Sequence, residues 1–277
     1  MVSLVVFLFG LAVGSFLNSV IYRLGKGESA LKGRSYCPQC KHPLSWQDLI
    51  PLLSFALLQG KCRYCRAKIS WQYPLVELGT ATLFVVIFNF QFSIFNEFSV
   101  FQFSTLFYLW VIASLLVVIF VYDLKHYIIP DKVLYPAIAL AFFWRLLESI
   151  VNVIPNLIGD PALWIPAFAG MTGMVLAGLG AGAFFFAIYA LSKGRAMGFG
   201  DVKLAFFLGL FLGWPNILVA LFSAFTMGAL VGIALIAAKK KQLRSQVPFG
   251  PFLIGGTFFA LLFGEAITHW YLGLLMV

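Results

Sequence analysis

Eight long apolar runs constrain the fold of this 277-residue chain more than any other feature. Hydrophobic residues make up 62% of the chain and charged residues only 10%, whereas a soluble domain is nearer half apolar and a quarter charged. A run of about 20 apolar residues is long enough to cross a bilayer as a helix. The sequence therefore predicts an all-α polytopic membrane protein with about eight transmembrane helices. The runs lie at 1–22, 74–95, 100–122, 133–152, 163–191, 202–214, 216–238 and 251–275. The sixth run is short for a crossing of about 20 residues, so it must tilt, start within the membrane surface or borrow residues from the preceding GFGD loop.

The basic residues predict the orientation of these runs. The chain has a formal net charge of +9, and every Lys and Arg except Arg145 falls in alternate connecting segments, at 23–68, 123–132, 193–203 and 239–244. Basic loops are retained on the cytoplasmic side of a membrane. We therefore expect a multi-pass membrane protein with these loops in the cytoplasm and both termini outside. The charge is explained by topology in the lipid bilayer, so no nucleic-acid partner is expected.

All four cysteines fall in the first basic segment. Cys37 and Cys40 form one Cys-x2-Cys pair, and Cys62 and Cys65 form a second. Two such pairs are typical of a four-thiolate zinc site, so we predict a structural metal, zinc, in a small cytoplasmic zinc-ribbon-like loop. Two disulfides or four idle thiols are the alternatives, and a reducing cytoplasm disfavours the disulfides. We expect residues 1–95 to form an N-terminal part, made of the first span, this loop and the second span, and residues 96–277 to form a separate helical membrane domain.

Three aspartates stand at the predicted cytoplasmic ends of apolar runs. These are Asp123, Asp131 and Asp201. Ionisable groups at such positions are rare unless they are paired, hydrated or functional. Two carboxyl groups held close together share one proton, so one can take a proton from water while the other donates to a carbonyl. Asp123 and Asp201 are therefore candidates for a pair that hydrolyses an amide bond.

A simpler interpretation stays open for each of these aspartates, because a single carboxylate at a helix end is commonly a cap or a solvated charge. Asp131 fits that description well, since it follows Pro130 just before the fourth run. Further along that run, Glu148 lies three residues after Arg145 and is expected to pair with it.

Six short motifs are spread along nearly the whole chain. They are GSFLNSVIYRL (14–24), GRSYCPQC with CRYC in the cysteine loop, YPLVELGTA (73–81), DLKHYIIPD (123–131), GFGDVKLAFFLG (198–209) and VPFGPFL (247–253). Together, and in this order, they resemble the motifs of the bacterial type IV prepilin peptidases, which are membrane aspartic proteases of the Gly-x-Gly-Asp type, also called leader peptidase and N-methyltransferase.

The resemblance implies an activity. In that family the first aspartate of the D-x7-D stretch and the aspartate of the Gly-x-Gly-Asp motif form the catalytic pair, and these match Asp123 and Asp201. Asp131 matches an accompanying Pro-Asp, which we interpret as supporting structure. The implied substrates are prepilin and pseudopilin precursors, whose short basic leader ends in glycine and is removed at the cytoplasmic face. The new N-terminus is then methylated with S-adenosylmethionine.

The sequence does not show where a methyl donor would bind. The glycine-rich stretch GLGAGAFF (178–185) lies inside the fifth run and is expected to permit close helix packing rather than to bind a nucleotide. Asn18, Arg23 and Glu77 are candidate contributors to methyl transfer. Asn18 and Glu77 are equally explained as polar contacts between helices.

Two other functions remain in competition. A zinc-ribbon membrane transporter or ion channel would also use membrane-depth aspartates, although such a relay should distribute its acids across the bilayer rather than along one face. The chain has no internal repeat that would support transport. An inactive assembly factor that only holds pilins is a third possibility, which the presence of both Asp123 and Asp201 disfavours.

Overall fold

The computed structural model describes residues 1–29, 33–94, 100–157, 164–238 and 247–275. The chain falls into two compact units, Met1–Val121 and Tyr122–Val277. The division at residues 95 and 96 expected from the sequence stays a prediction.

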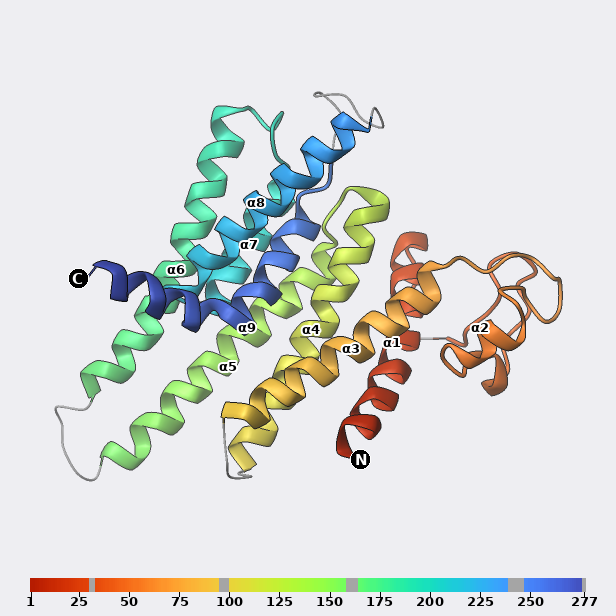
Figure 1. Cartoon of the computed structure of the whole chain (residues 1–277), viewed down its shortest axis with the longest axis horizontal. Helices are drawn as coiled ribbons and strands as arrows, with labels where there is room; N and C mark the ends of the chain where they lie inside the picture. Colours follow the sequence, from red (N-terminus) through yellow and green to blue (C-terminus); the bar gives the residue numbers. More distant parts are fainter. Residues whose placement is uncertain (30–32, 95–99, 158–163, 239–246, 276–277) are drawn as a thin grey trace. The chain divides into compact units, whose positions relative to one another are not determined.

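The described residues are helical, apart from connecting loops and two isolated antiparallel bridges in the cysteine loop. The elements are drawn in Figure 1. In chain order they are α1 (Val2–Lys26), the 3-10 helix η1 (Trp46–Leu49), α2 (Leu53–Leu57), α3 (Gln72–Ile94), α4 (Val100–His126), α5 (Asp131–Leu157), α6 (Trp164–Leu191), α7 (Phe199–Leu212), α8 (Asn216–Ala237) and α9 (Gly250–Leu275).

Seven of the described helices are long and apolar enough to cross a membrane, namely α1, α3, α4, α5, α6, α8 and α9. The predicted fold class is confirmed. The remaining apolar helix, α7, has 14 residues and is therefore about 21 Å long, shorter than the roughly 30 Å hydrocarbon core of a bilayer. This is the sixth apolar run, which the sequence already marks as too short for a full crossing.

In the first unit, α1 and α3 lie side by side (Figure 1) because small residues let their backbones approach. A Cβ atom at Gly10 would lie 2.6 Å from the Cα atom of Ala81, and one at Gly14 would lie 2.7 Å from the Cα atom of Glu77. Neither position has room for a side chain. The two glycines therefore fix the contact that joins the first helix to the helix following the cysteine loop.

Glycines at close contacts between helices also pack the second unit. A Cβ atom at Gly209 of α7 would lie 2.6 Å from the Cα atom of Gly178 in α6, and one at Gly256 of α9 would lie 2.3 Å from the main-chain oxygen of Ala220 in α8. Gly178 belongs to the glycine-rich stretch of the fifth run, so its expected role in helix packing is confirmed. Two tight helix pairs, α6 with α7 and α8 with α9, result (Figure 1).

An arginine from α5 contacts the end of α7. Nη2 of Arg145 donates a hydrogen bond of 2.7 Å to the main-chain oxygen of Phe211, in the last turn of α7. Nη1 donates to Oε2 of Glu148 at 2.7 Å, which confirms the pair expected from the sequence. The last carbonyl groups of a helix have no hydrogen-bond donor within the helix. Arg145 supplies a donor for the carbonyl of Phe211 at the end of α7.

Candidate functional site

The two aspartates expected to act together lie in the same unit, each near a helix terminus. Asp123 is in the last turn of α4 and its side chain is buried, with 4% of the residue exposed. Asp201 is in the first turn of α7, after the N-cap residue Gly198. The two are near enough for the charge of Asp123 to act on Asp201.

Ile129 connects the surroundings of both carboxyl groups. It is buried in the loop between α4 and α5. A Cβ atom at Gly200 would lie 3.2 Å from Cβ of Ile129, and one at Gly250 would lie 3.6 Å from its Cδ1 atom. Gly200 precedes Asp201, and Gly250 lies against the carboxyl group of Asp123. The structure therefore brings the end of α4 and the starts of α7 and α9 together around one side chain.

Asp131 has a different environment. It is the first residue of α5, as the Pro-Asp sequence suggested, and its side chain is 51% exposed. Its Oδ1 atom accepts a hydrogen bond from Nζ of Lys203 in α7, and the same Nζ lies 5.3 Å from the ring centroid of Tyr135. Asp131 thus ties the start of α5 to the first turns of α7. This geometry agrees with a supporting role.

We expect Asp131→Asn to retain most of any activity that depends on Asp123 and Asp201. An exposed ion pair contributes about 1 kcal/mol or less, which corresponds to about a fivefold change. Initial rates of the variant and the unchanged protein at equal concentration check this. A rate lower by about a hundredfold or more, with the helices still folded, would give Asp131 a direct part in the reaction.

The second group of candidate residues is the cysteine cluster in the first unit. All four cysteines are free of disulfides, and their Sγ atoms lie within 4.8 Å of one another. Sγ of Cys37 and Sγ of Cys65, from different pairs, are 3.9 Å apart. In a tetrahedral zinc site with Zn–S bonds of about 2.3 Å, neighbouring sulfurs are about 3.8 Å apart. The four thiols therefore fit one zinc ion.

Both cysteine pairs have the same backbone conformation. The amide of Cys37 donates to the carbonyl of His42, and the amide of Cys62 donates to that of Ala67. Lys41 and Arg66, each four residues after the first cysteine of its pair, have φ values of 59° and 60°. This left-handed conformation, unusual outside glycine, closes each turn so that both sulfurs face inward. The two turns are therefore built alike around a shared centre.

The thiols differ in acidity. Burial disfavours the thiolate of Cys37, but hydrogen bonds from the main-chain amides of Cys40 and Gln39 outweigh it and lower the pKa of Cys37 to about 7. The amide of Ala67 favours the thiolate of Cys65, but burial and the neighbouring thiols together raise its pKa to about 11. Once one thiol ionises, the next is harder to ionise, unless a cation replaces the protons. The cluster is therefore suited to a metal ion.

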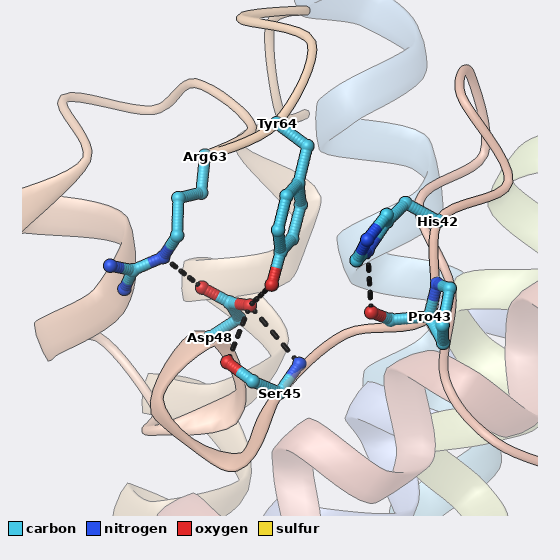
Figure 2. A network of polar contacts seen from close by, with 6 residues as sticks. All are labelled: His42, Pro43, Ser45, Asp48, Arg63 and Tyr64. Carbon is cyan, nitrogen blue, oxygen red and sulfur yellow. Dashed lines mark hydrogen bonds and ion pairs between the residues drawn. The ribbon is translucent and has the colours of Figure 1, made fainter.

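Asp48 joins the two cysteine pairs (Figure 2). Its carboxylate accepts hydrogen bonds from Nε of Arg63 at 2.6 Å, from the hydroxyl of Tyr64 at 3.2 Å, and from the amide and hydroxyl of Ser45. Burial opposes its ionisation, but the bonds from Arg63 and Ser45 outweigh it and hold the pKa of Asp48 below its usual range. The ring of His42 stacks on Tyr64 with centroids 3.8 Å apart. The network thus holds the second turn against the first.

The candidates for methyl transfer are buried and already hydrogen-bonded within the first unit. Nδ2 of Asn18 donates to the main-chain oxygen of Tyr73 at 3.0 Å, and Nη2 of Arg23 donates to that of Gly33 at 2.8 Å. Oε2 of Glu77 accepts a bond of 2.9 Å from the amide of Leu52. The bond from Asn18 joins α1 to α3, and the other two tie α1 and α3 to the cysteine loop, which favours polar contacts over a methyl-donor site. We therefore assign no residues to the methyl donor.

Sequence reasoning missed three residues that the structure places at these sites. Gly250 lies within the motif VPFGPFL, but nothing in the sequence shows that it faces Asp123. The ion pair of Asp48 with Arg63 was also not visible in the sequence. Only the local contact of Asp48 with Ser45, three residues earlier, has a sequence pattern, that of a capping box. Ile129 carried no signal beyond its place between two aspartates.

Two family models match the chain. The Bacterial Peptidase A24 N-terminal domain matches residues 8–91, and the Type IV leader peptidase family matches residues 110–233. The first match includes the cysteine loop, and the second includes both Asp123 and Asp201.

Curated relatives agree with these matches. A prepilin leader peptidase/N-methyltransferase of Aeromonas hydrophila is 35% identical over 96% of this chain and 92% of its own length. Proteins of the same name from Bacillus subtilis and Legionella pneumophila are 33% and 32% identical and cover 97% and 98% of this chain and 97% and 94% of their own lengths. No solved structure matches the chain. The chain therefore belongs to the type IV leader peptidase family.

Proposed function

We propose that this protein removes the leader peptide from prepilin and pseudopilin precursors and then methylates the new N-terminus. Its family membership and its relatives' name, prepilin leader peptidase/N-methyltransferase, support both activities. The observation that carries the peptidase assignment is the meeting of α4, α7 and α9 around Ile129, which lies near both Gly200, next to Asp201, and Gly250, against the Asp123 carboxyl group. The family gives no support to the transporter or channel alternative.

We propose that the two carboxyl groups divide the work of hydrolysis. One of Asp123 and Asp201 is ionised and takes a proton from a water molecule as the water oxygen attacks the scissile carbonyl carbon. The other is protonated and donates its proton to the carbonyl oxygen. The C–N bond then breaks, the amine leaves with a proton, and the leader ends in a free carboxylate. The burial of Asp123 supports this assignment because a buried carboxyl group can hold a proton that an exposed one would lose.

The location of the pair fits a substrate that is itself a membrane helix. Asp123 lies in the last turn of one candidate span, and Asp201 lies in the first turn of a helix too short to be one. We propose that this end of the unit faces the cytoplasm, since the neighbouring loops carry Lys125, Lys132, Lys193 and Arg195. A prepilin could then diffuse within the bilayer and present its cleavage bond at the water boundary.

We propose zinc as the structural metal of the cysteine cluster. Cys37, Cys40, Cys62 and Cys65 would hold it, and because four thiolates fill a tetrahedral site, no position is open for a reacting water. S-adenosylmethionine would supply the methyl group for the second reaction. Because the four-thiolate site is closed, the cysteine loop stabilises the fold and takes no part in the hydrolysis.

Co-expression with a prepilin tests both activities in one measurement. The mass of the pilin N-terminus, determined after purification, should show loss of the leader and gain of one methyl group. A pilin that keeps its leader, in cells where the protein is present and membrane-inserted, would refute the peptidase assignment. A shortened pilin without the added methyl group would refute the second activity alone.

A further inference from the structure

We propose that Gly250 is a positioning residue for Asp123, and that the absence of a side chain at position 250 keeps the carboxyl group in its working position. This inference rests on the aspartate pair of the proposed function and adds a third part to it. Gly250 is the first residue of α9, and it is buried.

The contact between the two residues leaves no room for a substituent. A Cβ atom at position 250 would lie 2.5 Å from Oδ2 of Asp123 and 3.3 Å from its Cγ atom. Cβ atoms essentially never come within 3.0 Å of another heavy atom in this way. Alanine at position 250 would therefore force either the carboxyl group or the first turn of α9 to move.

Packing holds this carboxyl oxygen in place. Oδ2 of Asp123 is buried and has no hydrogen-bond partner among the residues that the structure describes. The main chain of Gly250, including its amide, faces the Asp123 carboxyl group directly, so this group rests on the first residue of α9. The position of Oδ2 is thus set by the shape of its neighbour, and that shape depends on glycine.

The N-terminus of α9 also offers a favourable electrostatic environment for a carboxylate. The first amides of a helix have no partner within it, and the N-terminus carries a partial positive charge. Pro251 has no amide hydrogen, and the amides of Phe252 and Leu253 bond to the carbonyl of Phe249. A glycine at the first position lets this end of the helix approach a carboxyl group directly. Any side chain there would separate the two.

Three alanine substitutions on α9 separate this role from general packing. Gly273 has no atom within 4 Å of its hypothetical Cβ, so Gly273→Ala is expected to change nothing. At Gly256 the obstruction is the main chain of Ala220 in α8, so Gly256→Ala should lower stability. At Gly250 the obstruction is the Asp123 carboxyl group. Gly250→Ala should therefore lower activity while leaving the helices packed.

The test measures kcat, KM and thermal unfolding of the full-length purified variants with a prepilin substrate. For Gly250→Ala we expect kcat to fall by about a hundredfold, because a displacement of about 1 Å can have that effect, with KM within about threefold of the original. Its unfolding temperature should match that of Gly273→Ala. A kcat within about threefold of the original, or unfolding as early as for Gly256→Ala, would overturn the proposal.

Failure of this proposal is distinguishable from failure of the aspartate pair. If Asp123→Asn is inactive while Gly250→Ala is fully active, the pair stands and Gly250 has no positioning role. If Asp123→Asn itself cleaves the prepilin normally, the assignment of Asp123 is wrong, and the proposal for Gly250 falls with it.

Discussion

Asparagine in place of either Asp123 or Asp201 is expected to abolish leader removal, with a decrease in rate of about a thousandfold or more. The substitution keeps the size and polarity of the side chain but removes its capacity to take or give a proton. Asp123 is buried in the last turn of α4, and Asp201 lies in the first turn of α7. The exposed Asp131, which is paired with Lys203, is not placed to replace either of them. The measurement is the rate of prepilin cleavage by purified protein.

Asp131→Asn is the matched control for these variants, because it makes the same chemical change in the same loop region at an exposed ion pair. The two pair variants should be equally inactive, and combining them should produce no further decrease, since both groups act in one step. Normal processing by either single variant would refute the shared role. Measuring unfolding temperatures alongside the rates shows whether the fold has been retained.

Removal of two thiols is expected to have the second largest effect. In the protein with Cys37→Ser and Cys40→Ser, we expect bound zinc to fall from about one ion per chain to nearly none, because two thiolates cannot replace a four-thiolate site. A structural zinc site contributes strongly to folding its own loop. The loop between α1 and α3 should therefore become sensitive to protease. Cleavage should be affected less than methylation, because the aspartate pair lies in the second unit and the cysteine loop in the first.

Gln39→Ser is the control for this experiment, since it introduces serine in the same turn without removing a thiol. Its zinc content and protease resistance should equal those of the unchanged protein. Metal analysis of the purified, unchanged protein can contradict the zinc proposal directly. If four reduced, reactive thiols are found with no bound metal, the zinc proposal is wrong.

The membrane architecture could be predicted from the sequence because it depends on local properties. A helix that crosses lipid must satisfy its own backbone and present apolar side chains, so each of the long described helices coincides with an apolar run. The cysteine cluster was predictable for a similar reason, as two Cys-x2-Cys turns have few other uses. Even the shortness of α7 was visible in the sequence.

The contacts that build the site were not predictable in this way. Asp123 and Asp201 are far apart in the chain; their shared place at predicted cytoplasmic ends of apolar runs and the family resemblance suggested that they act together, but neither shows what surrounds them. Gly250 shows its importance only when the position of Asp123 is known, because its role is defined by the absence of atoms. Asp48 likewise bonds to Arg63 across a turn that no periodicity predicts. Such contacts depend on the path of the whole chain.

The hydrogen bond from Arg145 to the main-chain oxygen of Phe211 has a consequence for where the protein can cut. Residues 201 and 211 are separated by about 15 Å along the axis of α7. Because α7 is a rigid helix, fixing the position of residue 211 also fixes the position of Asp201. A prepilin would have to bring its peptide bond to that level. If the Asp201 end of α7 faces the cytoplasm, as we propose, the contact between Arg145 and Phe211 at the opposite end of α7 would set how deep in the bilayer the enzyme can cut.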